Sequence, residues 1–452
     1  MRSALLAIAA SLPFVIALAG CSMGGDEGSD GASGDGNLAN CSGPDCKPGS
    51  GGSSGGASGG PPPTATDGKK NGTETDADCG GANAPKCGDG KSCAAASDCE
   101  SGVCSGGKCA VPNGTDGVKN GDETDVDCGG TKTGAPKCAA TKACAAHADC
   151  ESDGCGYDKK CAVAPSCAGH FGGDTCGAGE VGEAGAQHET CCAVAPIPGN
   201  NTMVLDKYVV TAGRFRQFAE RTKGDLKGWA EANAANNPDW NAAWNAKLPA
   251  SIDEMNFLLG PTGHGPRAGC DLDASRGRTY WMSDAENQAL GESGTHPFTK
   301  DVLDQKALNC VEFYMLQAFC IWDGGRLAKQ AEFKAAWQGG ENRKWPWGGG
   351  NFDQSKVNWK YSYSFPEVYD QGNFVFVGAP GRVPDGNSKN GHSDLAGLVF
   401  EWLSDVNGAQ ATWSGSGSWE GHDAVADGAS YGLTDASRAY WATGGRCARP
   451  AQ

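Results

Sequence analysis

Cysteine is the residue type whose number and spacing in this sequence could do the most chemistry. Eighteen of the 23 cysteines lie between Cys41 and Cys192. Most of them belong to a duplicated stretch that begins TDGKKNGTETDADCGG at Thr66 and returns as TDGVKNGDETDVDCGG at Thr115. The two copies contain Cys79, Cys87, Cys93, Cys99, Cys104 and Cys109, and then Cys128, Cys138, Cys144, Cys150, Cys155 and Cys161. Six cysteines in a small module form either disulfides or a metal site.

The spacing favours disulfides over zinc. Structural zinc sites commonly hold the metal with C-x-x-C pairs, and this sequence contains no such pair. We therefore expect three disulfides per repeat in an exported protein, although the spacing does not fix which cysteines pair. Cys167, Cys176, Cys191 and Cys192 form a further even set, and setting Cys21 aside leaves 22 cysteines, so no free thiol is required.

The start of each repeat carries oxygen-bearing side chains around glycines, a pattern that could bind a hard cation such as calcium. These residues are Asp67, Asn71, Glu74, Asp76 and Asp78 in the first repeat, and Asp116, Asn120, Glu123, Asp125 and Asp127 in the second. Their spacing does not match an EF-hand loop, which places ligands at alternate positions and closes with a glutamate. A solvated acidic turn explains the pattern equally well, so calcium is one of two interpretations.

The N-terminus predicts export and a lipid anchor. A positively charged start precedes an apolar run over residues 4–19, too short for a spanning helix of about 20 apolar residues. Cys21 ends the motif Leu-Ala-Gly-Cys and stands where a bacterial lipobox places the cysteine that receives a diacylglycerol. Ordinary secretion is the alternative, because residues 17–19 also form an A-x-A cleavage site. By resemblance to bacterial sorting rules, Ser22 after the cysteine indicates the outer membrane and the cell surface.

Composition divides the chain into segments. The net charge of −17 excludes a nucleic-acid-binding protein, because phosphates require a basic surface. The stretch from Ser22 to Asp67 is rich in Gly, Ser, Asp and Pro and predicts a disordered tether, in which Cys41 and Cys46 close a small loop. The expected segments are a signal peptide at 1–20, the tether at 21–66, Cys-rich repeats at 67–113 and 114–165, a Cys-containing connector at 166–196, and a domain at 197–452.

The C-terminal half can build an aromatic core, because all 13 tryptophans lie between Trp229 and Trp441. Apolar periodicity predicts a helix after Thr211 as N-cap, a second over Asn309–Trp322 and a third over Lys329–Gln338. The rest is rich in Gly, Asn and Trp and lacks long alternating runs. The predicted fold class is therefore α+β, with short strands, long ordered loops and little regular secondary structure.

Five stretches of this half carry a family resemblance. They are DKYVVTAGRFRQF from Asp206, FCIWDGGRLAKQAEFKAAWQGG from Phe319, WPWG from Trp345, DLAGLVFEW from Asp394 and GGRCAR from Gly444. In this order they resemble the formylglycine-generating enzyme family, also called sulfatase-modifying factors, over about residues 197–450. The resemblance implies a variant of the C-type-lectin-like fold, with a disulfide between Cys320 and Cys447, which leaves Cys270 and Cys310 to pair. The repeats resemble Cys-rich stalk modules of myxobacterial surface lipoproteins.

The resemblance also implies metal sites. Asn358 aligns with a family calcium ligand, which makes calcium a candidate here as well. Active family members resemble G-S-W/Y-x-C followed, after four intervening residues, by a second cysteine, and this thiolate pair suits soft Cu(I). The motif aligns here with residues 417–420, which places Gly421 and Ala426 at the two cysteine positions. Neither side chain can bind a metal, so copper is not expected.

One further position departs from the family's sequence pattern. Lys329 replaces the family's usual capping threonine, which removes an N-cap contribution of about 1 kcal/mol. The histidines of this domain show no metal-binding spacing such as H-x-x-x-H, and we expect them to be surface or loop residues. They are His264, His296, His392 and His422.

These features favour a lipid-anchored surface protein whose domain binds an extracellular protein or glycan. Its only membrane contact would be the lipid on Cys21, and no catalytic residue is assigned. A copper-dependent oxidase that converts a sulfatase cysteine to formylglycine is the alternative function. A third hypothesis is that the domain carries a different, unidentified enzymatic site in the pocket that family members use for catalysis.

Overall fold

The computed structural model describes residues 65–260, 269–271, 278–291, 298–358, 377–414 and 431–451. The chain separates into two units, Met1–Pro62 and Pro63–Gln452, and every described residue belongs to the second. The signal peptide, most of the tether, and Cys21, Cys41 and Cys46 therefore lie outside the described residues. Within the described ranges, no helix is both long and apolar enough to cross a membrane.

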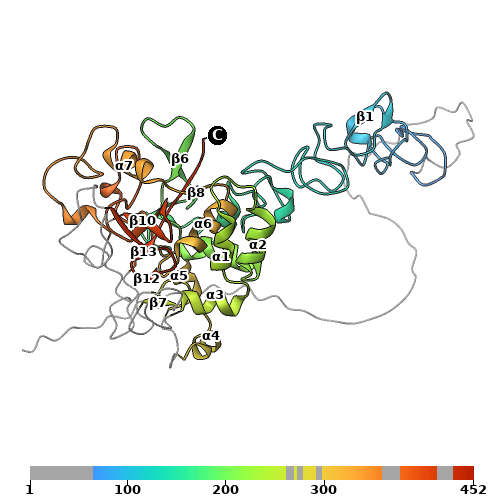
Figure 1. Cartoon of the computed structure of the whole chain (residues 1–452). Coiled ribbons are helices and arrows are strands. Elements are labelled where there is room, and N and C mark those ends of the chain that lie inside the picture. Colours follow the sequence, from blue (N-terminus) through green and yellow to red (C-terminus); the bar gives the residue numbers. More distant parts are fainter. Residues whose placement is uncertain are drawn as a thin grey trace, which may run out of the picture. The chain divides into compact units, whose positions relative to one another are not determined.

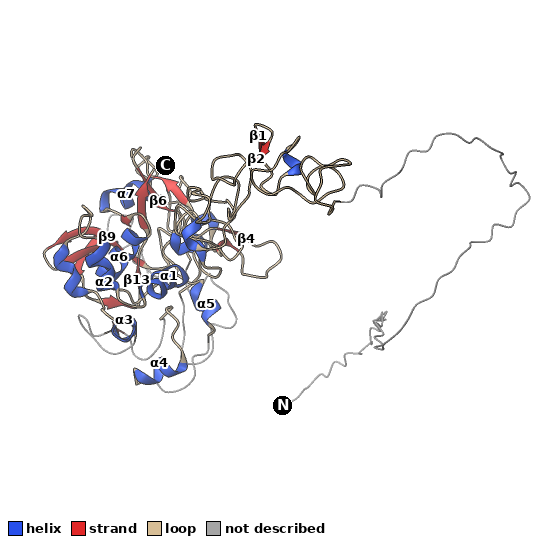
Figure 2. Cartoon of the chain, turned by 90° about the vertical axis from the view of Figure 1, so that its right-hand side faces the viewer, coloured by secondary structure: helices blue, strands red, loops and turns tan. Residues whose placement is uncertain are grey.

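Each of the two repeats is stabilised by its own disulfides and contains little regular structure (Figure 2). Each has the same connectivity, in which the first cysteine pairs with the second, the third with the fifth and the fourth with the sixth. The bonds are Cys79–Cys87, Cys93–Cys104 and Cys99–Cys109, and then Cys128–Cys138, Cys144–Cys155 and Cys150–Cys161. The buried cysteines form the small core of each repeat, which is how a module with few large apolar side chains can fold.

The connector packs into the C-terminal domain. Its disulfides are Cys167–Cys192 and Cys176–Cys191. Strands β3 (Cys176–Ala178) and β4 (Gln187–Glu189) form a hairpin, and β5 (Val194–Pro196) pairs with the first strand of the domain. Ten disulfides occur among the described residues, and this density indicates an extracytoplasmic protein.

The domain is α+β, with short strands in small sheets between long loops. One antiparallel sheet has the order β5-β6-β14-β8, and a second sheet has the order β11-β10-β9-β13. The first uses β6 (Met203–Asp206), β8 (Arg326–Leu327) and β14 (Cys447–Pro450); the second uses β9 (Phe400–Asn407), β10 (Gln410–Ser414), β11 (Tyr431–Asp435) and β13 (Thr443–Gly444). Two further pairs are β7 (Cys270–Asp271) with β12 (Ala439–Tyr440), and β1 (Cys104–Ser105) with β2 (Lys108–Cys109) of the first repeat.

The described residues of the domain contain seven α-helices. They are α1 (Ala212–Thr222), α2 (Leu226–Asn233), α3 (Ile252–Leu259), α4 (Asp284–Ala289), α5 (Lys300–Asp304), α6 (Phe313–Trp322) and α7 (Gln330–Gln338). Helices α1, α2 and α6 contact one another (Figure 1). Their aromatic side chains, among them Phe215, Phe218 and Phe319, form the centre of the largest core cluster.

The structure confirms the predicted N-cap and the third predicted helix, which α7 matches to within one residue, and it corrects the second. Thr211 caps α1 by accepting the backbone N–H of Arg214. The second predicted helix begins four residues later than expected, because Cys310 has a φ of 57°, which an α-helix cannot contain. Helices α2 to α5 were not predicted, although each follows a side-chain cap. These caps are Asp225, Ser251, Ser283 and Thr299.

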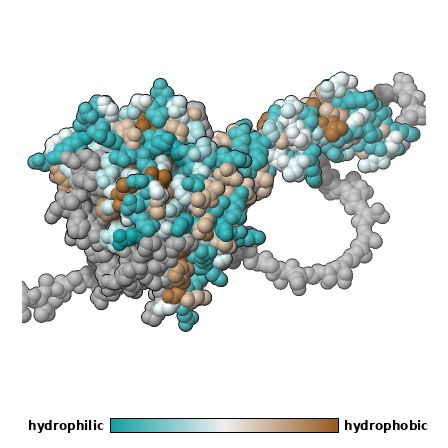
Figure 3. Space-filling view, in the orientation of Figure 1, coloured by the Kyte–Doolittle hydropathy of each residue, from teal (hydrophilic) through white to brown (hydrophobic). Residues whose placement is uncertain are grey.

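The tryptophan-rich stretch from Phe319 to Gly348 contributes buried residues to two core clusters of the domain. It ends α6, supplies β8 and α7, and brings Trp337, Trp345 and Trp347 together with Phe352. On the face shown in Figure 3, hydrophobic residues of the described chain occupy small separate patches within a mostly hydrophilic surface. Outside the cores, exposed large hydrophobics such as Val111, Val194 and Leu433 come from different segments.

Candidate functional site

Charged residues from separate family motifs meet inside the domain. Arg214, from the first motif, donates to Asp206 Oδ2 at 2.9 Å and to Asp323 Oδ2 at 2.7 Å, and none of the three side chains is exposed. Arg449, from the last motif, reaches the same two carboxylates at 2.6 and 2.5 Å. Burial opposes the ionisation of Asp323, but Arg449 and Arg214 outweigh it and hold the pKa of this carboxyl below its usual range.

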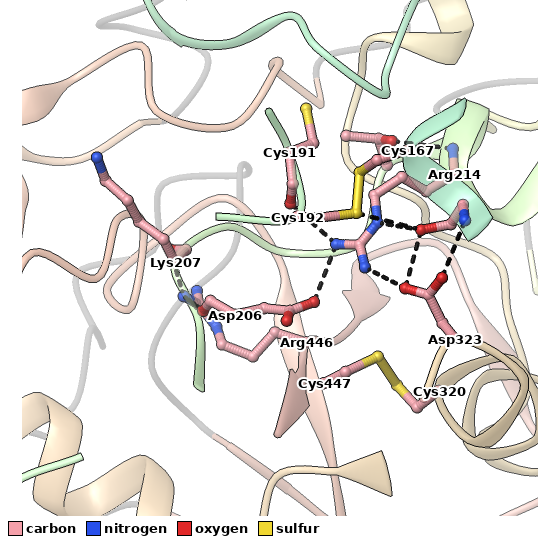
Figure 4. Close-up of polar contacts among 12 residues, drawn as sticks. Cys167, Cys191, Cys192, Asp206, Lys207, Arg214, Cys320, Asp323, Arg446 and Cys447 are labelled. Atoms are coloured by element: carbon pink, nitrogen blue, oxygen red, sulfur yellow. Dashed lines mark hydrogen bonds and ion pairs between the residues drawn. A yellow bond between two sulfur atoms is a disulfide. The ribbon is translucent and has the colours of Figure 1, made fainter. Parts of the chain in front are cut away.

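The connector closes this network from the other side (Figure 4). Ser166 Oγ accepts from Arg214 Nε at 2.9 Å and donates to Asp323 Oδ2 at 2.8 Å. The neighbouring Cys167–Cys192 disulfide fixes this segment beside Arg214, whose Nη1 also donates to the carbonyl of Cys191 at 3.0 Å. The connector is therefore joined to the domain by hydrogen bonds to buried charged side chains.

A second buried ion pair joins the DLAGLVFEW motif to the last motif. Arg446 donates to both carboxylate oxygens of Glu401 at 2.7 to 3.1 Å, and both side chains are fully buried. Its other N–H groups donate to the carbonyls of Lys207 and Ser393. These partners use the donor groups of Arg446 and leave it no access to a ligand. The charged residues of the motifs therefore hold the fold together.

Lys329 departs from the family pattern with a small structural effect. Its side chain makes no capping bond, as the sequence predicted. Glu332 instead accepts the backbone N–H of Lys329 at 2.8 Å, and it also binds Arg326 through both oxygens at 2.6 and 2.8 Å. The N–H of Gln330 finds a partner in Asp405 at 2.6 Å. Two backbone donors at the start of α7 are thus hydrogen-bonded without the threonine.

Asn358 lies in a buried polar setting that suits a cation. Its Nδ2 donates to the carbonyl of Ala379 at 3.0 Å, whereas its Oδ1 is buried without a hydrogen-bond partner. The carboxyl of Asp394 interacts with the Asn358 side chain, and burial raises the pKa of this carboxyl above its usual range. A Cβ on Gly378 would lie 2.7 Å from Asn358 Oδ1, so only glycine leaves this oxygen open. The two side-chain oxygens fit the preference of calcium for hard ligands.

The acidic residues at the start of the repeats mostly bind backbone N–H groups. Asp78 accepts the N–H of Gly68 at 2.8 and 2.9 Å, and Asp76 accepts the N–H of Ser92 at 2.7 Å. The second repeat reproduces these bonds, with Asp127 bound to Gly117 and Asp125 to Ala143. Within each turn Asp67 binds Asn71 and Glu74 binds the N–H of Asn71, and likewise Asp116 binds Asn120 and Glu123 binds the N–H of Asn120. Most of these carboxylate oxygens therefore already accept hydrogen bonds within their own repeat.

Three side-chain oxygens of the turns have no hydrogen-bond partner. Oδ1 of Asn71 and the equivalent Oδ1 of Asn120 are buried without hydrogen-bond partners. In the second repeat, Oε1 of the buried Glu123 also lacks a partner. Both interpretations of the sequence, a hydrogen-bonded acidic turn and a calcium loop, remain consistent with these contacts.

All 20 cysteines within the described ranges are in disulfides. The sulfurs of Cys93, Cys99 and Cys109 lie close together, as do their equivalents in the second repeat, but each is already bonded to another sulfur. In the domain the pairs are Cys270–Cys310 and Cys320–Cys447, the pairs assigned from the family resemblance and by elimination. Residues 417–426, which include Gly421 and Ala426, lie outside the described residues. The described part therefore offers no thiolate for Cu(I).

His392 meets the expectation that the domain histidines are surface or loop residues only through its position in a loop. It is in a loop, but its side chain has no solvent exposure. Burial, and then the nearby positive charge of Arg446, lower its pKa to about 3, so the ring is neutral. Its Nδ1 lies 3.1 Å from Ser388 Oγ. This burial makes His392 part of the core around Arg446; His264, His296 and His422 lie outside the described residues.

A polar pocket of about 310 Å³ opens beside strand β4, and no sequence motif predicted it. Glu189 Oε1 accepts from Lys207 Nζ at 2.5 Å and from the Tyr208 hydroxyl at 2.7 Å. Burial opposes the ionisation of Glu189, but these two donors outweigh it and lower the pKa of its carboxyl. Asn387 and Ser393 also line the pocket, with Ser393 Oγ donating to Asn387 Oδ1 at 2.7 Å. The pocket thus presents several donors and acceptors with a balanced charge.

A family model described as "Sulfatase-modifying factor enzyme 1-like domain" matches residues 177–451. The formylglycine-generating enzyme of Mus musculus is 33% identical over 122 residues, which cover 25% of this chain and 32% of that protein. The chain therefore aligns with about a third of the length of that relative. Among solved structures, PvdO from Pseudomonas aeruginosa is 16% identical with a TM-score of 0.30, covering 55% of this chain and 80% of that one. CarF is 15% identical with a TM-score of 0.31, covering 57% and 94%.

Proposed function

We propose that this chain, which belongs to the sulfatase-modifying factor enzyme 1-like family through residues 177–451, is a lipid-anchored surface protein whose family domain binds a ligand and does not oxidise cysteine. The repeats form its stalk and residues 21–66 its tether. The competing function is that of a copper-dependent, formylglycine-generating oxidase.

The pairing of the cysteines is the observation that carries this proposal. An oxidase of this family type needs Cu(I), and Cu(I) needs soft ligands such as paired thiolates. The four cysteines of the domain are consumed in two disulfides. The positions that the family motif assigns to the thiolates are Gly421 and Ala426, which have no ligand atom in any conformation. The residues present therefore do not fit copper, and we assign no redox step to this domain.

The anchoring proposal rests on the N-terminal sequence and on the disulfide content. Cys21 ends a lipobox-like motif, and a cysteine in that position carries two acyl chains, enough for stable membrane attachment. The disulfide-rich repeats that follow the tether match an oxidising environment outside the cytoplasm. We propose the outer face of the cell envelope as the location.

The polar pocket beside Glu189 is our candidate for the ligand site. Lys207 and Glu189 neutralise each other, so a charged ligand gains little there, whereas the mixture of donors and acceptors suits hydroxyl or amide groups. A volume of about 310 Å³ lies at the lower end of the range for small-ligand pockets, about 300–1,000 Å³. An exposed segment of a glycan or a peptide carries such groups, so a surface glycan or protein is the proposed partner.

We also propose that calcium supports the domain at Asn358. Asn358 Oδ1 and the Asp394 carboxylate would hold the ion, which when bound supplies positive charge between buried oxygens. The unpaired state of Asn358 Oδ1 supports this assignment. The equivalent assignment to the repeats is weaker, because their carboxylates already bind backbone N–H groups.

A copper titration of the purified, disulfide-intact chain tests the function. With Cu(I) supplied against a competing chelator, we expect no tight stoichiometric binding. An active formylglycine-generating enzyme titrated in parallel provides the positive control. Stoichiometric Cu(I) binding that blocks alkylation of two thiols would overturn the proposal, because it would require a thiolate pair.

A further inference from the structure

The second repeat contacts the C-terminal domain through a small group of side chains that includes two histidines. His147 lies in the repeat, in the single 3₁₀ turn His147–Asp149, and His170 lies in the connector. On the domain side, Arg221 at the end of α1 supplies most of the hydrogen bonds. Nothing in the proposed function accounts for histidines in this place.

His147 accepts two hydrogen bonds at one nitrogen. The backbone N–H of Cys155 donates to its Nδ1 at 3.0 Å, and Arg221 Nη2 lies 3.2 Å from the same atom. A backbone N–H and a guanidinium can only donate. Nδ1 must therefore carry its lone pair, so the ring is neutral with its proton on Nε2.

Because of this arrangement, protonation breaks the contact. An N–H at Nδ1 would point at two donors, and the new positive charge would lie beside Arg221. We propose that His147 is a pH-sensitive latch, and that protonation of Nδ1 releases the second repeat from the C-terminal domain. The stalk and the domain would then be rigidly joined in neutral medium and able to reorient in acidic medium.

The charged groups around His147 favour the neutral ring. Burial, and then Arg221, lower the pKa of His147, while Asp153 opposes the shift. Asp153 is itself bound to Lys137 at 2.5 Å, and the negative charge of Asp323 acts on Arg221 from the domain side. The imidazole is partly open to solvent, so protons can reach it. Histidine is the side chain that changes charge between about pH 5 and pH 8.

The remaining contacts at the junction are few. Arg221 donates to the carbonyls of Asp153 at 2.5 Å and Pro165 at 3.3 Å, and its guanidinium lies over the Trp322 ring at 5.6 Å. The Tyr157 ring contacts the His170 ring with centroids 4.2 Å apart. Repulsion between a protonated His147 and Arg221 therefore acts on the residue that makes most of the polar contacts.

His170 is not the switching group. Its Nδ1 faces the Asp174 carboxylate at 3.0 to 3.1 Å, a contact that a protonated ring keeps as an ion pair. Both sides of the junction also keep their own folds when it opens. Cys144–Cys155 and Cys150–Cys161 stabilise the repeat. Cys167–Cys192 closes the connector, which Ser166 joins to Arg214 and Asp323 of the domain by hydrogen bonds.

Energy transfer between two dyes on the full chain tests the latch. The dyes are attached through unnatural amino acids at the exposed positions Ala140 of the repeat and Lys334 of the domain. We expect transfer to change when the medium goes from about pH 7.5 to about pH 5, with a midpoint below the ordinary histidine pKa of about 6.5. His147→Gln, whose amide oxygen accepts at any pH, should keep the neutral-pH value throughout. His147→Ala should show the acid value at both pH values, with an unchanged near-UV circular dichroism spectrum.

His170→Phe is the matched control, because it keeps a ring against Tyr157 and removes the titrating group. It should titrate like the wild type. The proposal is overturned if the wild-type transfer does not change with pH, if His147→Gln titrates like the wild type, if His147→Ala keeps the neutral-pH value, or if His170→Phe abolishes the response.

Discussion

The guanidinium of Arg214 lies 2.7 Å from the carboxylate of Asp323, and neither side chain has any solvent exposure. The two residues are 109 positions apart, and their contact joins α1 to the end of α6. Because Asp206 and Arg449 share this network, the charges are balanced only while all four residues are present. The relation explains why charged residues of this family's motifs occur in a domain to which we assign no catalysis.

Removing Arg214 should destabilise the fold strongly. Arg214→Leu leaves the buried carboxylates of Asp206 and Asp323 with only Arg449, and breaking a buried pair costs about 3–5 kcal/mol. Urea unfolding of the disulfide-intact chain measures the change. Lys389→Ala, which breaks an exposed ion pair with Glu341, is the control and should have a far smaller effect. Equal shifts in the two variants would refute a structural role for the buried network.

The buried His392 should make stability depend on pH. Its pKa is about 3 in the folded state and about 6.5 when unfolded, so the unfolded chain binds the proton first. The contribution of the neutral ring is full above about pH 6.5 and is lost as the pH falls toward 3. Compared with His392→Asn, the free energy of unfolding of the wild type should fall more steeply, by up to about 1.4 kcal/mol per pH unit. Parallel curves for the two proteins between about pH 6 and pH 4 would contradict this assignment.

Calcium should stabilise the domain through Asn358. Added calcium should raise the unfolding temperature of the wild type, and a chelator should lower it, because the ion binds the folded state only. Asn358→Ala should abolish this calcium response, whereas Asp353→Asn, at an exposed carboxylate nearby in sequence, should retain it. A calcium response that survives in Asn358→Ala would move the site elsewhere, with the repeat turns as the next candidates.

The lipid anchor predicts how the mature protein partitions. When cells are extracted with a detergent that separates into two phases, the wild type should enter the detergent phase. Cys21→Ala should remain unprocessed or soluble, because it lacks the thiol that receives the lipid. Recovery of the wild type wholly in the aqueous phase, with cleavage after an ordinary signal peptide, would favour secretion.

The local features of the fold and the two domain disulfides were readable from the sequence, whereas the long-range ion pairs were not. Thr211 is a local N-cap, and the even sets of cysteines predicted disulfides, because both signals depend on neighbouring residues. The start of α6 was misplaced because a left-handed Cys310 leaves no trace in apolar periodicity. The contacts of Arg214 with Asp323 and of Glu189 with Lys207 join segments that only the folded chain brings together. The burial of His392 was missed for the same reason.

Incubation with a sulfatase peptide shows directly whether this domain oxidises cysteine to formylglycine. The purified chain is incubated with Cu(I), oxygen and a cysteine-containing sulfatase peptide, and the peptide is weighed by mass spectrometry; an active formylglycine-generating enzyme serves as the positive control. We expect the peptide cysteine to stay unchanged, because Gly421 and Ala426 occupy the two positions where copper binding requires thiolates. Copper-dependent conversion of that cysteine to formylglycine, lost in a Trp419→Ala variant, would contradict the account and identify the domain as an oxidase.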